Sequence, residues 1–150
     1  MKIVLDSNVL VSSLGKKSSL RPIWQAFIAG YYQIVVSESI LKEYEEILQV
    51  HAAPGAAELV MEIFIESPDI ITQKVYYNWN LISDVDDNKF YDVAVAAGVD
   101  YLVTNDRHFD VVKDITFPKI TIITAADFLD ILIRVWSFTM TNKTNQRNFS

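Results

Sequence analysis

Apolar residues in this chain follow two patterns, short continuous runs and longer stretches with helical spacing. The short runs are 3–5, 31–36, 101–104 and 120–124, and they are rich in β-branched residues. Continuous apolar runs of this length are typical of strands that are buried on both faces, as in a parallel sheet. The stretch 69–82 has no clean period, and a short strand there is an open alternative.

Helical spacing predicts the elements that connect these strands. Pro22 suits the first turn of a helix, and Gly30 and Gly98 suit the position just after a helix end. Ser37 or Ser39 is a candidate N-cap for the best-patterned helix. The expected helices are 20–29, the segment from this cap to about residue 48, the segment from about residue 59 until Pro68, 88–97 and 125–134.

Taken together, these strands and helices predict an α/β fold. Short apolar strands that alternate with helices favour a parallel sheet joined by right-handed crossovers. We therefore expect a three-layer α/β/α sandwich with a central parallel sheet over residues 1–134. The polar segment 135–150 is expected to be a flexible tail.

The amino-acid composition limits the kinds of site that the chain can form. The chain has 150 residues, no Cys, two His, 13 Lys and Arg, and 19 Asp and Glu, which gives a formal charge of −6. Without Cys there are no disulfides or thiolate sites, so a metal ion must be held mainly by oxygen. The first apolar run is too short for a signal peptide or a membrane span, so a cytoplasmic protein is expected. The acidic charge argues against a broad nucleic-acid surface.

Acidic residues gather at the predicted carboxyl ends of strands. Asp6 follows the first strand directly, and Asp106 follows a later one. A third group, Asp84, Asp86 and Asp87, precedes the helix that leads into that later strand. Each residue alone is also a common turn or cap residue. Their coincidence at one edge of a parallel sheet, where ligands bind in open α/β folds, predicts a functional site.

A further acid is expected from the helix that follows Ser37. At about 100° per residue, Glu43 and Glu45 lie at opposite borders of its apolar stripe, and Glu46 lies on the solvent face. The spacing does not choose between Glu43 and Glu45.

Converging carboxylates repel one another, which raises their pKa values unless a cation is bound. Mg²⁺ and Mn²⁺ are hard ions that prefer oxygen ligands and leave coordination positions for a substrate phosphate. The acids therefore favour phosphoryl chemistry, in which two metal ions about 4 Å apart activate water and stabilise the leaving oxygen.

Four blocks of the sequence resemble the PIN-domain ribonucleases, in particular the bacterial and archaeal PIN proteins related to toxins of toxin–antitoxin pairs. The blocks are IVLDSNVLVSSL, SESILKEYEEIL, DVDDNKFYDVAVAAGVDYLVTNDRHF and ITIITAADFL, in the family's order from Met1 to about Ile133. The resemblance implies a PIN-like fold and an endoribonuclease that hydrolyses RNA phosphodiester bonds with Mg²⁺ or Mn²⁺. It also implies a small antitoxin partner and, often, a homodimer.

The resemblance assigns catalytic and metal-binding roles to Asp6, Glu43, Asp87 and Asp106. It thereby selects Glu43 over Glu45. It also favours Asp87 over Asp84 and Asp86, because the distance from Asp87 to Gly98 fits the usual spacing across that helix.

Other polar residues complete the expected site. Asn8 and Thr104 occupy positions that orient an acid or a water in such sites, although Asn8 also suits a local turn. His51 and His108 are expected to be incidental, although His108 follows Asp106 closely enough to lie near the site. The candidate phosphate contacts, which fit a solvated surface cluster equally well, are Lys16, Lys17, Arg21, Lys89 and Arg107.

Other functions fit the pattern less well. A receiver-like signalling domain needs an acid pair near the first strand and a Lys after a late strand, but LDSN offers one acid and no Lys follows ITIIT. A phosphatase with an aspartyl nucleophile needs an Asp at the position of Asn8. A PIN-like module without activity, used for binding or assembly, is the main alternative, and the presence of all four acids disfavours it.

Overall fold

Five parallel strands form the central sheet of the computed structural model, which describes residues 1–148. Their spatial order is β3-β2-β1-β4-β5, and Ile3 of β1 pairs with Ile34 on one side and Tyr101 on the other. The chain order therefore reverses beside β1, which is where ligands bind in folds of this class. The strands are β1 (Lys2–Leu5), β2 (Gln33–Val36), β3 (Ile70–Thr72), β4 (Tyr101–Val103) and β5 (Ile122–Ile123).

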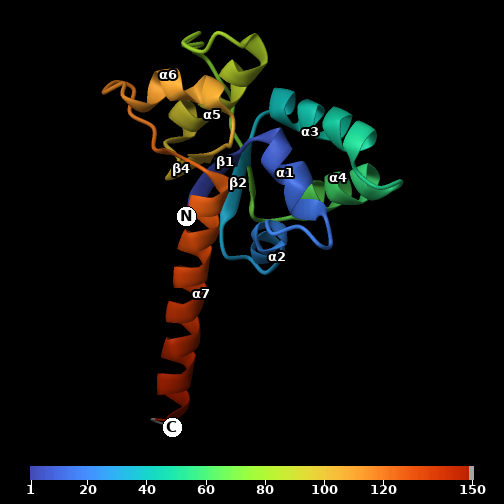
Figure 1. Ribbon diagram of the computed structural model, residues 1–150, viewed down its shortest axis with the longest axis vertical. Coiled ribbons are helices and arrows are strands. Elements are labelled where there is room, and N and C mark those ends of the chain that lie inside the picture. Colours follow the sequence, from blue (N-terminus) through green and yellow to red (C-terminus); the bar gives the residue numbers. More distant parts are fainter. Residues whose placement is uncertain (149–150) are drawn as a thin grey trace.

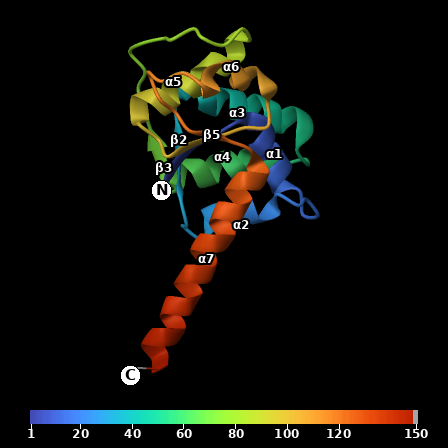
Figure 2. The same ribbon diagram turned by 60° about the vertical axis from the view of Figure 1, so that its left-hand side comes forward.

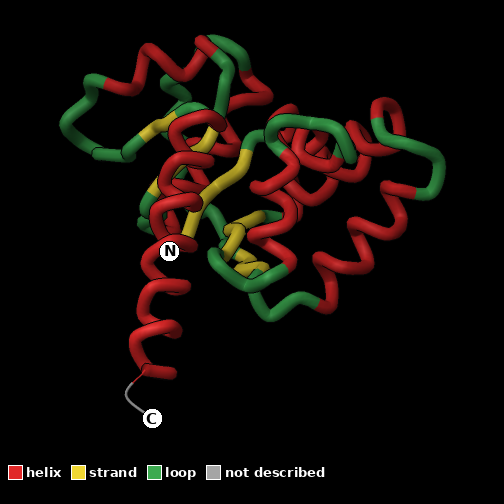
Figure 3. Tube along the Cα trace, turned by 60° about the horizontal axis from the view of Figure 1, so that its bottom comes forward, coloured by secondary structure: helices red, strands yellow, loops and turns green. Residues whose placement is uncertain are grey.

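Helices cover both faces of the sheet, so the predicted three-layer α/β/α sandwich is confirmed. Helix α5 packs on β1, β2 and β4, whereas α1 packs on α2 and α3, and α7 packs on α2. Figure 1 shows α5 and α6 on one side of the strands and α1 to α4 on the other, and Figure 3 shows the strands enclosed between helices. The helices are α1 (Ser7–Leu14), α2 (Arg21–Ile28), α3 (Glu38–His51), α4 (Ala56–Glu66), α5 (Asn88–Ala97), α6 (Asp110–Lys113) and α7 (Ala125–Asn148).

The predicted burial and helix ends agree with the structure. Strand β1 is buried on both faces, since its last three residues are each at most 1% exposed. The Ser37 hydroxyl caps α3 by accepting a hydrogen bond from the Ile40 N–H at 3.2 Å. Gly30 and Gly98 follow α2 and α5 with positive φ values of 80° and 61°, a conformation that favours glycine.

Helix α1 is not predicted by the hydrophobic pattern. Its residues, SNVLVSSL, include serines and β-branched valines, which have weak helix propensity. Val9 and Leu10 are buried, and the buried Ser13 hydroxyl donates to the Leu10 carbonyl at 2.6 Å. Tertiary packing on α2 and α3 thus stabilises a helix that its local sequence favours only weakly.

Helix α7 is longer than predicted, because it continues past residue 134 to Asn148. The polar segment after Thr139 has no apolar stripe, which removes the periodic signal, but no Pro or Gly interrupts the chain after Pro118. Figures 1 and 2 show the C-terminal half of α7 projecting away from the other elements. The flexibility expected of the tail stays a prediction, and residues 149–150 lie outside the described residues. None of the described helices combines the length and apolar character needed to cross a bilayer.

Candidate active site

Asp6 lies at the junction of β1 and α1 and is 5% exposed. Its backbone N–H donates to the Val103 carbonyl, which holds the end of β1 against β4. The Thr104 hydroxyl donates to Asp6 Oδ2 at 2.7 Å and accepts the Asp106 N–H at 3.0 Å. Burial raises the pKa of Asp6, and the Thr104 hydrogen bond opposes this rise, while the charges of Asp106 and Glu43 add to it. Thr104 therefore connects two of the acids that the sequence places at this edge.

Glu43 reaches the site from α3. The buried Tyr44 hydroxyl donates to the Leu5 carbonyl, which ties α3 to the carboxyl end of β1. The Ser7 hydroxyl donates to Glu43 Oε2, and the Lys89 Nζ lies 2.6 Å from Glu43 Oε1. Glu45, in contrast, is exposed and accepts a hydrogen bond from Gln49 at 3.5 Å. The two borders of the α3 stripe thus differ, and Glu43 is on the border that faces Asp6.

Asp87 stands at the N-cap position of α5, but its side chain makes no capping hydrogen bond. Its carboxylate is instead largely buried and lies 3.1 Å from His108 Nδ1. The Asn88 side chain fixes this turn, because it bonds both the N–H and the carbonyl of Ile82, at 3.0 Å and 2.9 Å. Burial raises the pKa of Asp87 to about 6, His108 opposes the shift, and nearby acids add to it.

Asp84 and Asp86, the other two acids of this segment, differ in their surroundings. Asp84 Oδ1 accepts the Asp86 N–H at 3.1 Å, and its Oδ2 lies 3.7 Å from His108 Nδ1. Asp86 itself is exposed. The carboxylates of Asp84 and Asp87 therefore both lie beside His108, and Asp87 is the more buried of the two.

His108 lies among the acids, in keeping with its closeness to Asp106 in the sequence but not with an incidental position. Its Nδ1 is 3.1 Å from Asp87 Oδ2 and 3.2 Å from Asp106 Oδ1. Asp106 Oδ1 also accepts the His108 N–H at 2.9 Å, so the turn after β4 folds His108 back over the acids. The hydrogen bond to Asp87 and the neighbouring negative charges raise the pKa of His108. Only its spacing of two residues from Asp106 hints at this role in the sequence.

The donors at this edge suit a divalent cation. One donor atom from each of Asp84, Asp87 and His108 lies within 4.8 Å of the others. Burial raises the pKa values of Asp6 and Asp87, and the negative charges of neighbouring acids add to the rise. A bound cation offsets both effects by favouring the ionised carboxylates. Carboxylate oxygens suit Mg²⁺ and Mn²⁺, and an imidazole is a ligand that also suits transition metals.

The remaining predicted residues lie in several places. Asn8 is exposed in the first turn of α1. Asn105, which lies between Thr104 and Asp106 and is not among the predicted site residues, accepts the Ala125 N–H at the start of α7 with its Oδ1. Lys89 is paired with Glu43, and Arg21 Nη1 donates to the Leu14 carbonyl, which closes the loop between α1 and α2. The other three candidate phosphate contacts, Lys16, Lys17 and Arg107, are exposed.

The chain is a parallel α/β sandwich with acids where the strand order reverses, which is the edge at which proteins of this class bind their ligands. The PIN domain family matches residues 2–108, and this chain belongs to that family. Among curated proteins, no sequence matches the chain.

Solved structures of the same fold include toxins and an endonuclease. VapBC2 from Rickettsia felis, bound to a DNA fragment from its promoter, matches with a TM-score of 0.58 and 19% identity over 83% of this chain and 98% of that chain. The sarcin–ricin loop cleaving toxin VapC20 of Mycobacterium tuberculosis matches with a TM-score of 0.55 and 11% identity over 73% and 94%. The PIN domain endonuclease Utp24 matches with a TM-score of 0.51 and 14% identity over 82% and 84%.

Proposed function

We propose that this protein is a metal-dependent endoribonuclease that hydrolyses RNA phosphodiester bonds with Mg²⁺ or Mn²⁺. The observation that carries the proposal is the convergence of Asp6, Asp87 and Asp106 on one edge of the sheet, linked through Thr104 and His108. Membership of the PIN domain family and the fold shared with VapC20 and Utp24 support it.

Each acid has a role set by its surroundings. Thr104 donates its hydroxyl to the Asp6 carboxylate and accepts the backbone N–H of Asp106, and the charge of Asp106 raises the pKa of Asp6, so these two acids are the proposed main metal ligands. Asp87 completes the set, with Asp84 beside it. When bound there, a divalent cation supplies charge neutralisation for the phosphate and makes water more acidic.

Glu43 has a different environment from the aspartates. Ser7 and Lys89 fix its two carboxylate oxygens, so its orientation is set before substrate arrives. Glu43 is positioned to ligate a metal or to orient the attacking water. Lys89 is the cation that balances Glu43, and it is also near enough to the acids to contact a substrate phosphate.

We further propose that the protein is the toxin of a toxin–antitoxin pair, acting in the cytoplasm, inhibited by a small antitoxin protein and able to form a homodimer. The fold shared with VapBC2 and VapC20 supports this assignment.

Incubation of the purified protein with end-labelled single-stranded RNA tests the nuclease activity. We expect cleavage with Mg²⁺ or Mn²⁺, none with EDTA, and none with the Asp6→Asn variant. Cleavage that persists in both controls would contradict the proposal. Retained RNA binding without any cleavage would instead favour the binding module.

A further inference from the structure

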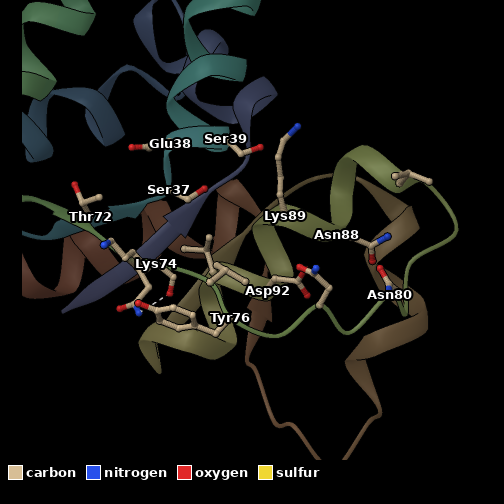
Figure 4. Close-up of a pocket in the computed structure, with 15 residues that line it drawn as sticks. Ser37, Glu38, Ser39, Thr72, Lys74, Tyr76, Asn80, Asn88, Lys89 and Asp92 are labelled. Atoms are coloured by element: carbon tan, nitrogen blue, oxygen red, sulfur yellow. Dashed lines mark hydrogen bonds between the residues drawn. The ribbon is translucent and has the colours of Figure 1, made fainter.

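A recess opens at the same edge of the sheet, beside the acidic cluster formed by Asp6, Glu43, Asp84, Asp87 and Asp106. Its volume is about 670 Å³, within the usual range for small-molecule sites. It lies between the N-terminal turn of α3, the end of β3, the first two turns of α5 and the segment 73–80. Figure 4 shows Ser37, Ser39 and Thr72 on one side of this recess and Tyr76, Asn80 and Asp92 on the other.

This recess is continuous with the proposed catalytic centre. Lys89 lines it and at the same time pairs with Glu43 at 2.6 Å. Asn88 also lines it and directly follows Asp87. An RNA strand that places a phosphate at the acids therefore places its neighbouring nucleotide at the recess.

The lining suits a nucleobase better than a charged group. Val75, Val85 and Val93 provide apolar surface, and neutral hydroxyl and amide side chains, such as Ser39 and Asn78, provide donors and acceptors. Apolar faces with a few convergent polar groups are the usual composition of a ligand pocket. Two lysines, Lys74 and Lys89, line the recess and suit the flanking phosphates. The lining acids are Glu38, which is exposed at the start of α3, and Asp92, whose Oδ1 accepts the Trp79 N–H at 3.0 Å.

The segment 73–80 forms an outer wall that is held at both ends. The Gln73 N–H donates to the Val36 carbonyl at 2.8 Å, and the Trp79 N–H donates to Asp92 Oδ1 at 3.0 Å. Between these anchors, the Tyr76 ring is 89% exposed although it lines the recess. An aromatic side chain left open to solvent at a nucleic-acid site is a platform on which a base can stack.

We propose that this recess is the subsite for the nucleotide adjoining the scissile phosphate of a single-stranded RNA, with Tyr76 stacking on its base and Lys74 contacting its backbone. The proposal rests on the endoribonuclease function. It differs from that function in its residues, because neither Tyr76 nor Lys74 belongs to the acidic cluster.

The test uses the full chain with two matched pairs of variants. Tyr76→Ala removes the stacking ring, and Tyr77→Ala removes an exposed neighbouring tyrosine that does not line the recess. Lys74→Gln and Lys42→Gln each remove one exposed positive charge, the first inside and the second outside the recess. Fluorescence anisotropy measures the affinity of each, in an Asp6→Asn background, for a short labelled single-stranded RNA.

We expect Tyr76→Ala to weaken RNA binding at least about fivefold, in keeping with the usual contribution of base–aromatic stacking. Lys74→Gln weakens binding and reduces its salt dependence, whereas both control variants stay close to the parent. A 4-thiouridine placed next to the cleaved bond crosslinks to segment 73–80, and peptide mapping by mass spectrometry locates the crosslink.

The outcomes separate this proposal from the nuclease function. If the wild type cleaves RNA but the two recess variants and their controls behave alike, and no crosslink maps to segment 73–80, the subsite is overturned and the nuclease stands. If the recess variants weaken RNA binding but the wild type never cleaves, the nuclease falls and the nucleotide site stands. If a peptide partner binds at the recess and does not change the affinity of the protein for the labelled RNA, the nucleotide subsite is also overturned.

Discussion

Thr104 donates its hydroxyl hydrogen to Asp6 Oδ2 at 2.7 Å, and both residues are buried. Thr104→Val keeps the shape and removes the donor, so the Asp6 carboxylate loses a partner that lowers its pKa. We expect a loss of about 1–3 kcal/mol in the free energy of unfolding at neutral pH, the usual cost of an unsatisfied buried group. We also expect a 10- to 100-fold loss of RNA cleavage, typical of residues that orient metal ligands.

Thr104→Ser is the matched control, because it keeps the hydroxyl. Urea unfolding in EDTA and initial rates of cleavage measure the two effects separately. A loss in the Ser variant with none in the Val variant would mean that the methyl group, and not the hydrogen bond to Asp6, determines both properties.

The raised pKa of Asp87 predicts that the free energy of unfolding depends on pH. Its pKa in the folded protein is about 6, above the model-peptide value of 3.8, so the folded state holds more protons than the unfolded state between these values. The contribution of Asp87 to stability is therefore fully present below about pH 4 and is lost as the pH rises through about 6. In EDTA, Asp87→Asn should raise the free energy of unfolding at neutral pH by about 1–2 kcal/mol after allowance for solvent screening.

The gain from Asp87→Asn should shrink as the pH falls toward 4 and disappear below about pH 3, where the wild-type carboxyl is protonated in both states. Thermal unfolding of both proteins across this range measures the difference. Asp86→Asn, at an exposed neighbouring position, is the control that should show no such change. A gain that is constant with pH would show that Asp87 is not the group responsible.

The parallel sheet and the acids at its edge were predictable because both depend on local sequence. Continuous apolar runs such as Ile3 to Leu5 report burial on both faces, and Asp6 follows directly. The choice between Glu43 and Glu45 was not available from spacing, because it depends on which border of α3 faces β1. That is a tertiary contact, made by the Tyr44 hydroxyl with the Leu5 carbonyl.

The parts that sequence patterns missed are those that lack a periodic signal. Helix α1 forms from residues of weak helix propensity because it packs on its neighbours. His108 enters the acidic cluster because a turn at Asp106 reverses the chain, and its spacing of two residues from Asp106 predicts only that it lies near the site. The recess walled by segment 73–80 depends equally on long-range anchors, such as Trp79 to Asp92, that a single sequence does not reveal.

Glu43 should be essential to cleavage and Glu45 should not. Glu43→Gln removes a carboxylate that Ser7 and Lys89 hold in place, so we expect a loss of at least about 100-fold in the single-turnover rate of cleavage, within the range for a group that assists proton transfer. Glu45→Gln changes an exposed residue on the same helix and should stay within about twofold of the wild type. Single-turnover cleavage of end-labelled RNA compares them, and equal rates for the two variants would contradict the assignment.

Divalent cations should stabilise the folded protein through the acidic cluster. A ligand at about 100 times its Kd raises the free energy of unfolding by about 2.7 kcal/mol. We therefore expect Mn²⁺ to raise Tm in the wild type, and Asp106→Asn to lose most of that shift. Asp110→Asn is the control, because Asp110 is exposed and paired with Lys113 outside the cluster. A Tm shift that survives in Asp106→Asn and is lost in Asp110→Asn would place the metal elsewhere.

The C-terminal part of α7 should be dispensable for folding. Leu132 is 5% exposed and belongs to the core, whereas the helix beyond Ser137 projects from the other elements. A chain that ends after Ser137 should keep its free energy of unfolding within about 1 kcal/mol, because no described core residue is removed. A chain that ends after Leu129 removes Leu132 and should lose at least about 2 kcal/mol. Urea unfolding at several protein concentrations measures both, and equal destabilisation by the two truncations would show that the projecting helix is part of the folding unit.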